Sequence, residues 1–281
     1  MREAEPVIAL DLFPPERQEL LLLLSQLQDE EWHKPTVCPG WTVKDIVLHL
    51  LGDDVGRLSR NRDVFDDSTL MNISPTLSSW NDLVAYINER NELWVQATRR
   101  MSNRLVCTFL ALTGEETYQY FSSLDLYALG EPVSWAGPNP APVWLDIARE
   151  YTERWVHQQQ IRDAVGKPGL KDQYFFAPVL ETFVRALPQT FREIDATDGT
   201  HIHLIITGEA GGEWYLQREQ EIWVLGKDVA SAANATVVLD QENAWRLFTK
   251  GIGKDEALQR ATFNGNEMLA RKVFDTVSII A

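Results

Sequence analysis

Two histidines and one glutamate form a candidate set of metal ligands. Glu153 and His157 are four residues apart in a segment with helical character, so their side chains lie on one face of that helix. His49 lies at the flank of the apolar stripe of an earlier helical segment, near Asp45 and Asp53. Two imidazoles and one carboxylate are the usual protein ligands of a catalytic zinc ion, with a fourth position left for water or substrate. One interpretation is therefore a divalent-metal site.

The spacing also allows a plainer interpretation. Glu153 and His157 lie roughly opposite the apolar stripe of their helix and beside Glu150, which is the pattern of a solvated acidic face. That stripe consists of Trp144, Ile147, Ala148, Tyr151 and Trp155. Leu145 and Val156 add apolar surface outside the stripe, which indicates burial on more than one side. Spacing alone leaves both interpretations open.

The remaining histidines and the cysteines suggest no second site. His201 and His203 share one face of a predicted strand without an acidic or thiol partner nearby in sequence, so we expect a solvent-facing pair. His33, at a helix end, has no identifiable partner. Cys38 and Cys107 are too few for a disulfide framework or an all-cysteine zinc site, and we expect reduced thiols. Cys38 precedes a proline in a loop, with no evident base to make it a nucleophile.

The first 170 residues are predicted to be helical. Helical periodicity appears in the leucine-rich run 20–27, in 43–51 with Thr42 as N-cap, in a segment that begins at Ser78 or Ser79, and in 143–165. The stretch 105–121 is apolar, but Thr113 and Gly114 are expected to interrupt it. A loop rich in glycine and proline covers 130–142, and Gly166 follows the long helix.

The rest of the chain changes character. Residues 174–193 still have a helical pattern, and β-branched and aromatic strands then alternate with short turns. The strand segments are HIHLIITG, EWYLQRE, EIWVLG and ATVVLD, and two helices are predicted near Glu242–Phe248 and Asn266–Val273. A chain of 281 residues exceeds the usual size of one hydrophobic core. We therefore predict a helical domain over 1–170 and a small α+β domain over 171–281, which is an α plus α+β fold class.

Composition excludes several function classes. The chain carries 26 Lys and Arg against 41 Asp and Glu, a net charge of −15, which disfavours nucleic acid and anionic membrane surfaces as partners. No apolar run approaches the roughly 20 residues of a membrane-spanning helix. The N-terminus shows no signal-peptide pattern. With its reduced cysteines, the chain is expected to be cytoplasmic.

Two segments resemble a known family. TVCPGWTVKDIVLHLLGDD, residues 36–54, resembles the signature of the mycothiol-dependent maleylpyruvate isomerase family, a branch of the DinB-like four-helix bundles. EYTERWVHQQQIRDAVGKPG, residues 150–169, resembles the family's second signature. The resemblance implies that His49, Glu153 and His157 are metal ligands, with zinc or another divalent ion such as nickel bound. One position departs from the pattern: where relatives often carry Asp three residues after the second His, this chain has Gln160.

The C-terminal segment from Ala233 to Phe274 is similar to the sterol-carrier-like domain often fused to these bundles. Family membership implies an enzyme that uses mycothiol or another low-molecular-weight thiol to isomerise a small electrophile or to conjugate with it. The groups that hold the thiol and substrate are not evident. Arg149, Arg154 and Arg162 lie near the ligands in sequence, but we expect exposed side chains or i,i+4 partners such as Glu150 with Arg154.

A non-catalytic function is the alternative. In it, the C-terminal domain would hold an apolar ligand in a pocket lined by four aromatic side chains, Trp214, Tyr215, Phe248 and Phe263. The same side chains are equally the composition of an ordinary hydrophobic core, and that is the interpretation we favour.

Overall fold

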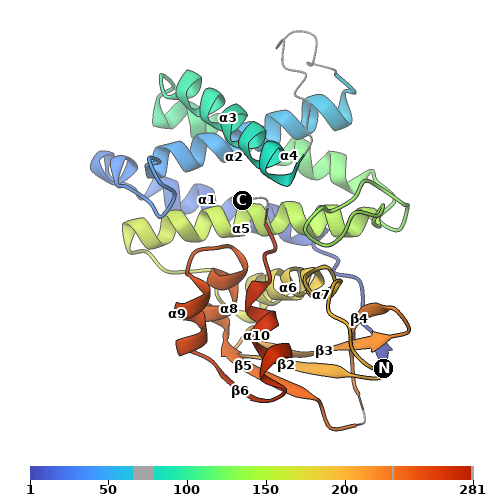
Figure 1. Ribbon diagram of the computed structural model, residues 1–281. Helices are drawn as coiled ribbons and strands as arrows, with labels where there is room; N and C mark the ends of the chain where they lie inside the picture. The colour runs from blue at the N-terminus through green and yellow to red at the C-terminus, as the bar shows by residue number, and fades with distance from the viewer. Residues whose placement is uncertain (66–78, 230, 280–281) are drawn as a thin grey trace. The chain divides into compact units, whose positions relative to one another are not determined.

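The structure is a computed structural model that describes residues 1–65, 79–229 and 231–279. The chain forms two compact units (Figure 1). The helical unit comprises Leu10–Asp125 and Glu153–Gly169, and the sheet unit comprises Met1–Ala9, Leu126–Thr152 and Leu170–Ala281. The long helix α5, Val143–Val165, supplies residues to both. Among the described residues, no helix combines the length and hydropathy needed to cross a bilayer.

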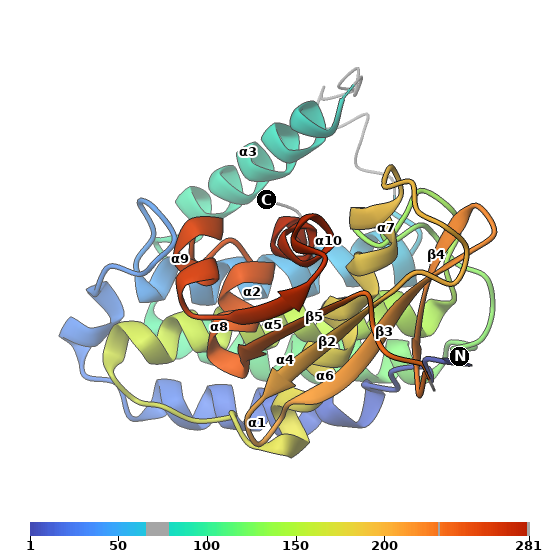
Figure 2. The same cartoon turned by 60° about the horizontal axis from the view of Figure 1, so that its bottom comes forward.

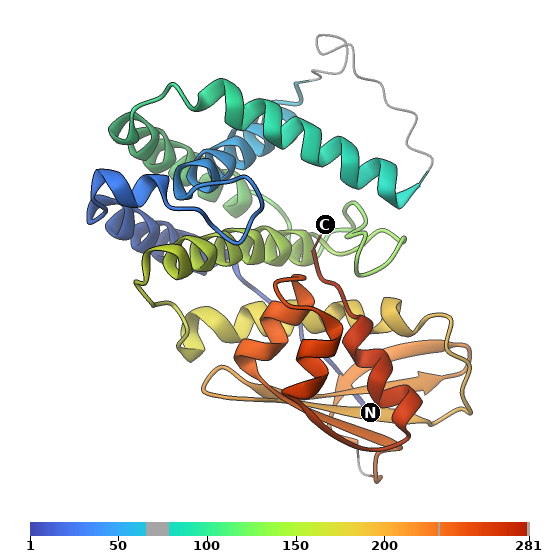
Figure 3. The ribbon, with the colours of Figure 1, turned by 60° about the vertical axis from the view of Figure 1, so that its left-hand side comes forward.

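The helical unit consists of helices that lie side by side (Figure 3) and share one apolar core. They are α1 (Phe13–Ser25), α2 (Val43–Arg57), α3 (Trp80–Thr98), α4 (Asn103–Ser122) and the second half of α5, with short helical turns at Leu10–Leu12, Asp29–His33 and Leu58–Arg62. Buried side chains from each of these five helices meet in that core, for example Leu20, Ile46, Val95, Leu110 and Ile161. The helical bundle expected from the sequence is therefore present, and within it α2 packs against both α3 and α4.

Side-chain caps set the start of three of these helices. Thr42 accepts a hydrogen bond from the Asp45 amide, and the Asp45 side chain accepts one from the Thr42 amide, so the predicted N-cap is present and forms part of a capping box. Ser79 caps α3 through the Asp82 amide. The alternative start at Ser78 lies outside the described residues. Ser102 caps α4 in the same way.

The expected interruption at Thr113 and Gly114 is wrong, because α4 continues through both residues. Each residue serves a buried contact. The Thr113 hydroxyl donates a hydrogen bond to Asp54 Oδ2 at 2.8 Å. A Cβ atom at Gly114 would lie 2.9 Å from Arg17 Nη1, so glycine leaves room for that guanidinium. Thr113 and Gly114 have low helix propensity, but they do not end the helix. Their small side chains instead allow α4 to pack against charged groups.

Strands and short helices build the sheet unit (Figure 2). Its sheet has the order β1-β4-β3-β2-β5-β6, with β2 and β5 parallel and the other neighbours antiparallel. The strands are β1 (Arg2–Glu3), β2 (His201–Thr207), β3 (Gly212–Glu219), β4 (Ile222–Lys227), β5 (Ala235–Asp240) and β6 (Thr262–Gly265). The helices are α6 (Gln173–Phe183), α7 (Leu187–Phe191), α8 (Gln241–Phe248), α9 (Lys254–Gln259) and α10 (Glu267–Lys272), with turns at Val184–Ala186 and Val273–Asp275.

One face of this sheet is buried. Leu204 pairs with Trp214 on one side and with Val237 on the other, and all three are at most 2% exposed. Helix α7 contacts β4, α8 contacts β2 and β5, and α10 contacts β5 and β6. Alternate residues such as His203 and Tyr215 lie on the other face and are only partly buried. The period-two pattern of the sequence therefore predicts the buried face correctly.

The predicted fold class is confirmed: a helical N-terminal part precedes a C-terminal part built on a sheet. The long helix at 143–165 and the strand at 235–240 have the predicted bounds. Three short elements, β1, α9 and β6, are not predicted from the sequence. The two units begin and end at other residues than the domains expected at 1–170 and 171–281, and those domain bounds stay a prediction.

Candidate metal site in the helical unit

A tight turn before α2 places an aromatic ring against His49. The Trp41 amide donates to the Cys38 carbonyl at 3.1 Å, and Gly40 within this turn has φ +79°, a value that glycine adopts without strain. The Trp41 ring centroid then lies 5.2 Å from that of His49. The Trp41 indole N–H donates to Glu92 Oε2 at 2.7 Å, which holds the ring in place. The Pro-Gly-Trp segment therefore forms one wall beside His49.

Four side chains meet between α2 and α5. The Nε2 atoms of His49 and His157 are 3.1 Å apart, and the two rings are close to perpendicular at 82°. Asp53, one turn after His49, places Oδ2 3.3 Å from His49 Nε2. Glu153, one turn before His157, places Oε2 3.6 Å from His157 Nε2. We name these four residues the histidine cluster. The structure thus brings together all three residues predicted as ligands, and adds Asp53.

Gln160 orients the second imidazole. Its Oε1 atom is 2.8 Å from His157 Nδ1, and because an amide oxygen only accepts, Nδ1 carries the proton. His157 Nε2 therefore presents a lone pair to the cluster, as a metal ligand must. Glutamine at position 160, where relatives often carry aspartate, still provides a hydrogen-bond acceptor for His157 Nδ1. It lacks the negative charge of an aspartate side chain. The Cys38 thiol donates to the same oxygen at 3.3 Å.

Burial keeps both imidazoles neutral. Desolvation, and then the positive charge of Arg154, lower the pKa of His49 to about 4. Desolvation and the neighbouring His49 lower the pKa of His157, although Glu153 and Asp53 oppose the shift. Neutral imidazole is the form that binds metal ions. Burial raises the pKa of the Cys38 thiol, in spite of a hydrogen bond with Thr36, which disfavours its thiolate form.

A second group of charged side chains lies next to the cluster on the same helices. The Asp54 carboxylate is fully buried and accepts hydrogen bonds from Arg17 Nη1, Arg154 Nη2 and the Thr113 hydroxyl, each at 2.8 Å. We name these four residues the arginine network. Burial raises the pKa of Asp54, but the charges of Arg17 and Arg154 outweigh it and the pKa is lowered. Arg154 is 3% exposed, so the expectation of an exposed side chain is wrong.

The donor set fits a divalent cation, although the ligands are not yet arranged around one point. Among the described residues, no three His, Cys, Asp or Glu side chains form a ready-made cage for an ion. The two imidazoles instead face each other as hydrogen-bonding partners. Around a tetrahedral zinc ion with bonds of about 2.0–2.2 Å, neighbouring ligand atoms lie about 3.3–3.6 Å apart. Three separations in the cluster, at 3.1, 3.3 and 3.6 Å, lie in or near that range, which is compatible with ligation of one ion.

The two histidines predicted to share a strand, His201 and His203, belong to the sheet unit. His201 is 2% exposed, and its ring nitrogens lie 3.2 Å from the Gly199 carbonyl and 3.3 Å from the Ser231 carbonyl. The prediction of a solvent-facing pair is therefore wrong for His201, because the backbone segments that precede β2 and β5 cover it. His203 does have an acidic partner, Glu213 on the neighbouring strand, with the two side chains 2.8 Å apart.

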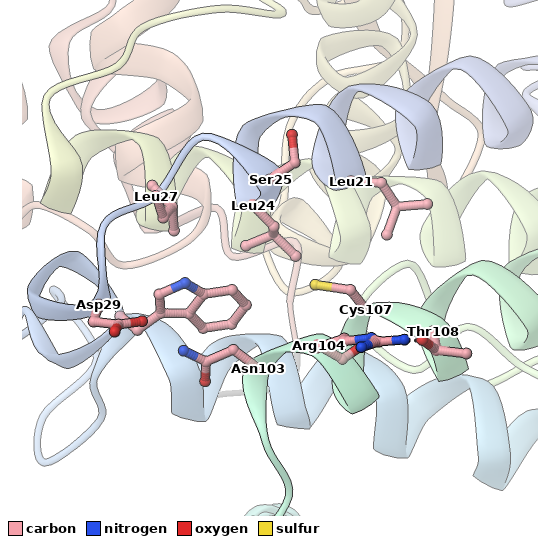
Figure 4. Close-up of a pocket in the computed structure, with 10 residues that line it drawn as sticks. Leu21, Leu24, Ser25, Leu27, Asp29, Asn103, Arg104, Cys107 and Thr108 are labelled. Atoms are coloured by element: carbon pink, nitrogen blue, oxygen red, sulfur yellow. The ribbon is translucent and has the colours of Figure 1, made fainter.

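The helical unit also contains a hollow of about 500 Å³, between α1, the turn Asp29–His33 and α4 (Figure 4). Leu24, Trp32 and Cys107 are among the side chains that line it, and no residue of the histidine cluster is. Of the aromatic residues suggested as a pocket in the C-terminal domain, Trp214 and Phe248 are at most 2% exposed. Their burial fits the core interpretation.

Comparisons with known proteins agree with this architecture. The family described as the mycothiol maleylpyruvate isomerase N-terminal domain matches residues 13–162, which include the whole histidine cluster. The chain therefore belongs to the mycothiol maleylpyruvate isomerase family, as its two signatures predicted. No curated protein matches the sequence.

Two solved structures share the fold. One is titled the crystal structure of the mycothiol-dependent maleylpyruvate isomerase, with a TM-score of 0.52. The other is a histidine-to-alanine mutant of the enzyme with that name, with a TM-score of 0.51. In both cases the identity is 10%, and the alignment covers 88% of this chain and 91% of the other. At this identity the likeness concerns the fold alone.

Proposed function

We propose that this protein is an enzyme in which a low-molecular-weight thiol, mycothiol or a relative of it, reacts with a small electrophile such as maleylpyruvate. The observation that carries the proposal is the convergence of His49 and His157 at 3.1 Å, with a carboxylate beside each, in a chain of this family. His49, Glu153 and His157 would hold the divalent metal, zinc or another ion such as nickel. When bound, the metal lowers the pKa of a thiol that coordinates it, so that thiolate is available at neutral pH.

The protein's own residues prepare this site. Gln160 fixes the proton of His157 on Nδ1 and thereby aims the Nε2 lone pair into the cluster. Trp41 packs its ring against His49, with the two ring centroids 5.2 Å apart. The buried Asp54–Arg154 contact joins α2 to α5 one residue beyond Asp53 and Glu153, which keeps the two ligand-bearing helices at a fixed separation.

The thiolate supports two related reactions. In an isomerisation, a C–S bond forms at an activated double bond and the π electrons move to the adjacent carbonyl. The former double bond then rotates as a single bond, and expulsion of the thiolate restores it, so nothing is consumed. In a conjugation, the thiolate stays attached and the product gains the sulfur. The cytoplasm, where thiols stay reduced, is the compartment that suits this chemistry and the free Cys38 and Cys107.

Steady-state turnover tests the proposal. Maleylpyruvate and model electrophiles are offered to the metal-loaded protein with a panel of thiols that includes mycothiol, and product geometry and thiol consumption are followed separately. We expect turnover that requires a thiol and that the His157→Ala variant lacks. Isomerisation leaves the thiol concentration unchanged, whereas conjugation lowers it. Absence of thiol-dependent turnover across the whole panel would refute the proposal.

A further inference from the structure

Asp53 is the member of the histidine cluster that neither sequence signature identified as a ligand. Its Oδ2 atom lies 3.3 Å from His49 Nε2, which is closer than the 3.6 Å between Glu153 Oε2 and His157 Nε2. Asp53 is thus at least as well placed toward its histidine as the predicted ligand Glu153 is. The side chain is 31% exposed, so it reaches the cluster from the rim of the helical core.

Each of the two helices contributes one imidazole and one carboxylate to the cluster. Residues four apart on a helix lie one above the other on the same face. Asp53 therefore reaches the ring of His49 on α2, and Glu153 reaches the ring of His157 on α5.

From this geometry we infer that Asp53 is a fourth donor to the cation, which makes the set two histidines, one aspartate and one glutamate; the inference rests on the proposed metal site. The sequence of contacts Asp53–His49–His157–Glu153 has separations of 3.3, 3.1 and 3.6 Å, near those between neighbouring ligands of one tetrahedral ion. With Asp53 bound as well, the thiol of the proposed function would join as a fifth ligand, a coordination number that catalytic zinc sites can reach.

Metal titration of the full-length protein tests this role. Metal-free wild type and Asp53→Asn are titrated with Zn²⁺ in competition with a chelating dye, and with Co²⁺ alone, whose visible absorption depends on its donors. We expect Asp53→Asn to raise the Zn²⁺ dissociation constant by at least about tenfold, since losing even a group that only supports a ligand weakens binding about 10–100-fold. The Co²⁺ spectrum should change as well. Asp53→Glu, which keeps a carboxylate, should restore part of the affinity.

Asp63→Asn is the matched control. It removes the same charge from a half-exposed carboxylate whose partner is Arg62, and it should leave the Zn²⁺ affinity and the Co²⁺ spectrum unchanged. If wild type binds Zn²⁺ and Asp53→Asn binds it equally well with an unaltered Co²⁺ spectrum, the role of Asp53 is refuted while the three-ligand site stands. If wild type itself binds neither ion, the proposed metal site fails instead. Circular dichroism confirms that each variant is folded.

Discussion

The histidine cluster and the arginine network are built from adjacent residues of the same two helices. On α2, Asp53 belongs to the cluster and Asp54 to the network. On α5, Glu153 belongs to the cluster and Arg154 to the network. Consecutive positions on a helix differ by about 100° in direction, so neighbours in sequence enter different surroundings. In the network, a carboxylate contacts two guanidinium groups. In the cluster, carboxylates contact imidazoles that burial keeps neutral.

This difference in partners gives the arginine network a structural role and the histidine cluster a chemical one. In the network, the Asp54 carboxylate and the two guanidinium groups carry opposite charges and form hydrogen bonds of 2.8 Å. Removing one partner leaves a buried charge without compensation, which lowers the stability of the fold. Neutral imidazoles and carboxylates that converge offer lone pairs, and a divalent cation can use these. We therefore expect changes in the network to affect folding, and changes in the cluster to affect metal binding.

The largest effect is expected from Asp54→Leu, which removes the carboxylate that both Arg17 and Arg154 contact. The free energy of unfolding should fall by about 3–5 kcal/mol, the usual result of removing one partner from a buried ion pair. Asp53→Leu, the same change one residue earlier, is the control and should cost less than half as much. Urea unfolding of the metal-free proteins measures both. Equal losses would contradict the separation of roles.

Gln160→Leu should give an intermediate effect on the cluster. It removes the acceptor that fixes the His157 proton on Nδ1, so the ring can turn or change tautomer. We expect Zn²⁺ affinity to fall by about tenfold or more. Gln159→Leu, a change at the buried neighbour that donates to the Gly169 carbonyl, should leave the affinity unchanged. An equal fall in both variants would show that the effect is not specific to His157.

A smaller, pH-dependent effect is expected from Glu16→Gln, beside the arginine network. Burial raises the pKa of Glu16, although Arg17 and Gln158 oppose the shift, and its Oε2 atom has no hydrogen-bond partner among the described residues. A raised carboxyl pKa means that stability falls as pH rises from about 4.5 toward the folded-state value. The variant lacks this loss, so its unfolding free energy relative to wild type should increase between pH 5 and pH 8. A difference that does not change with pH would contradict this.

Much of this architecture could be predicted from local sequence. Helix periodicity and capping located α2 and α5, and the signatures named His49, Glu153 and His157. The arginine network could not be predicted, because Arg17, Asp54 and Thr113 come from three helices and only packing brings them together. Thr113 and Gly114 even suggested a break, since their fit to buried charges is not visible in one segment. His201 was misjudged because distant backbone covers it.

Metal content after identical purification tests the central claim most directly. Elemental analysis compares wild type with His49→Ala and His157→Ala, and circular dichroism confirms that the apolar core keeps each variant folded. His33→Ala, an exposed histidine of the same unit, and His203→Ala, in the sheet unit, are the controls. The account predicts about one divalent ion per chain in wild type and in both controls, and almost none in the two cluster variants. Full occupancy in both His49→Ala and His157→Ala would contradict it.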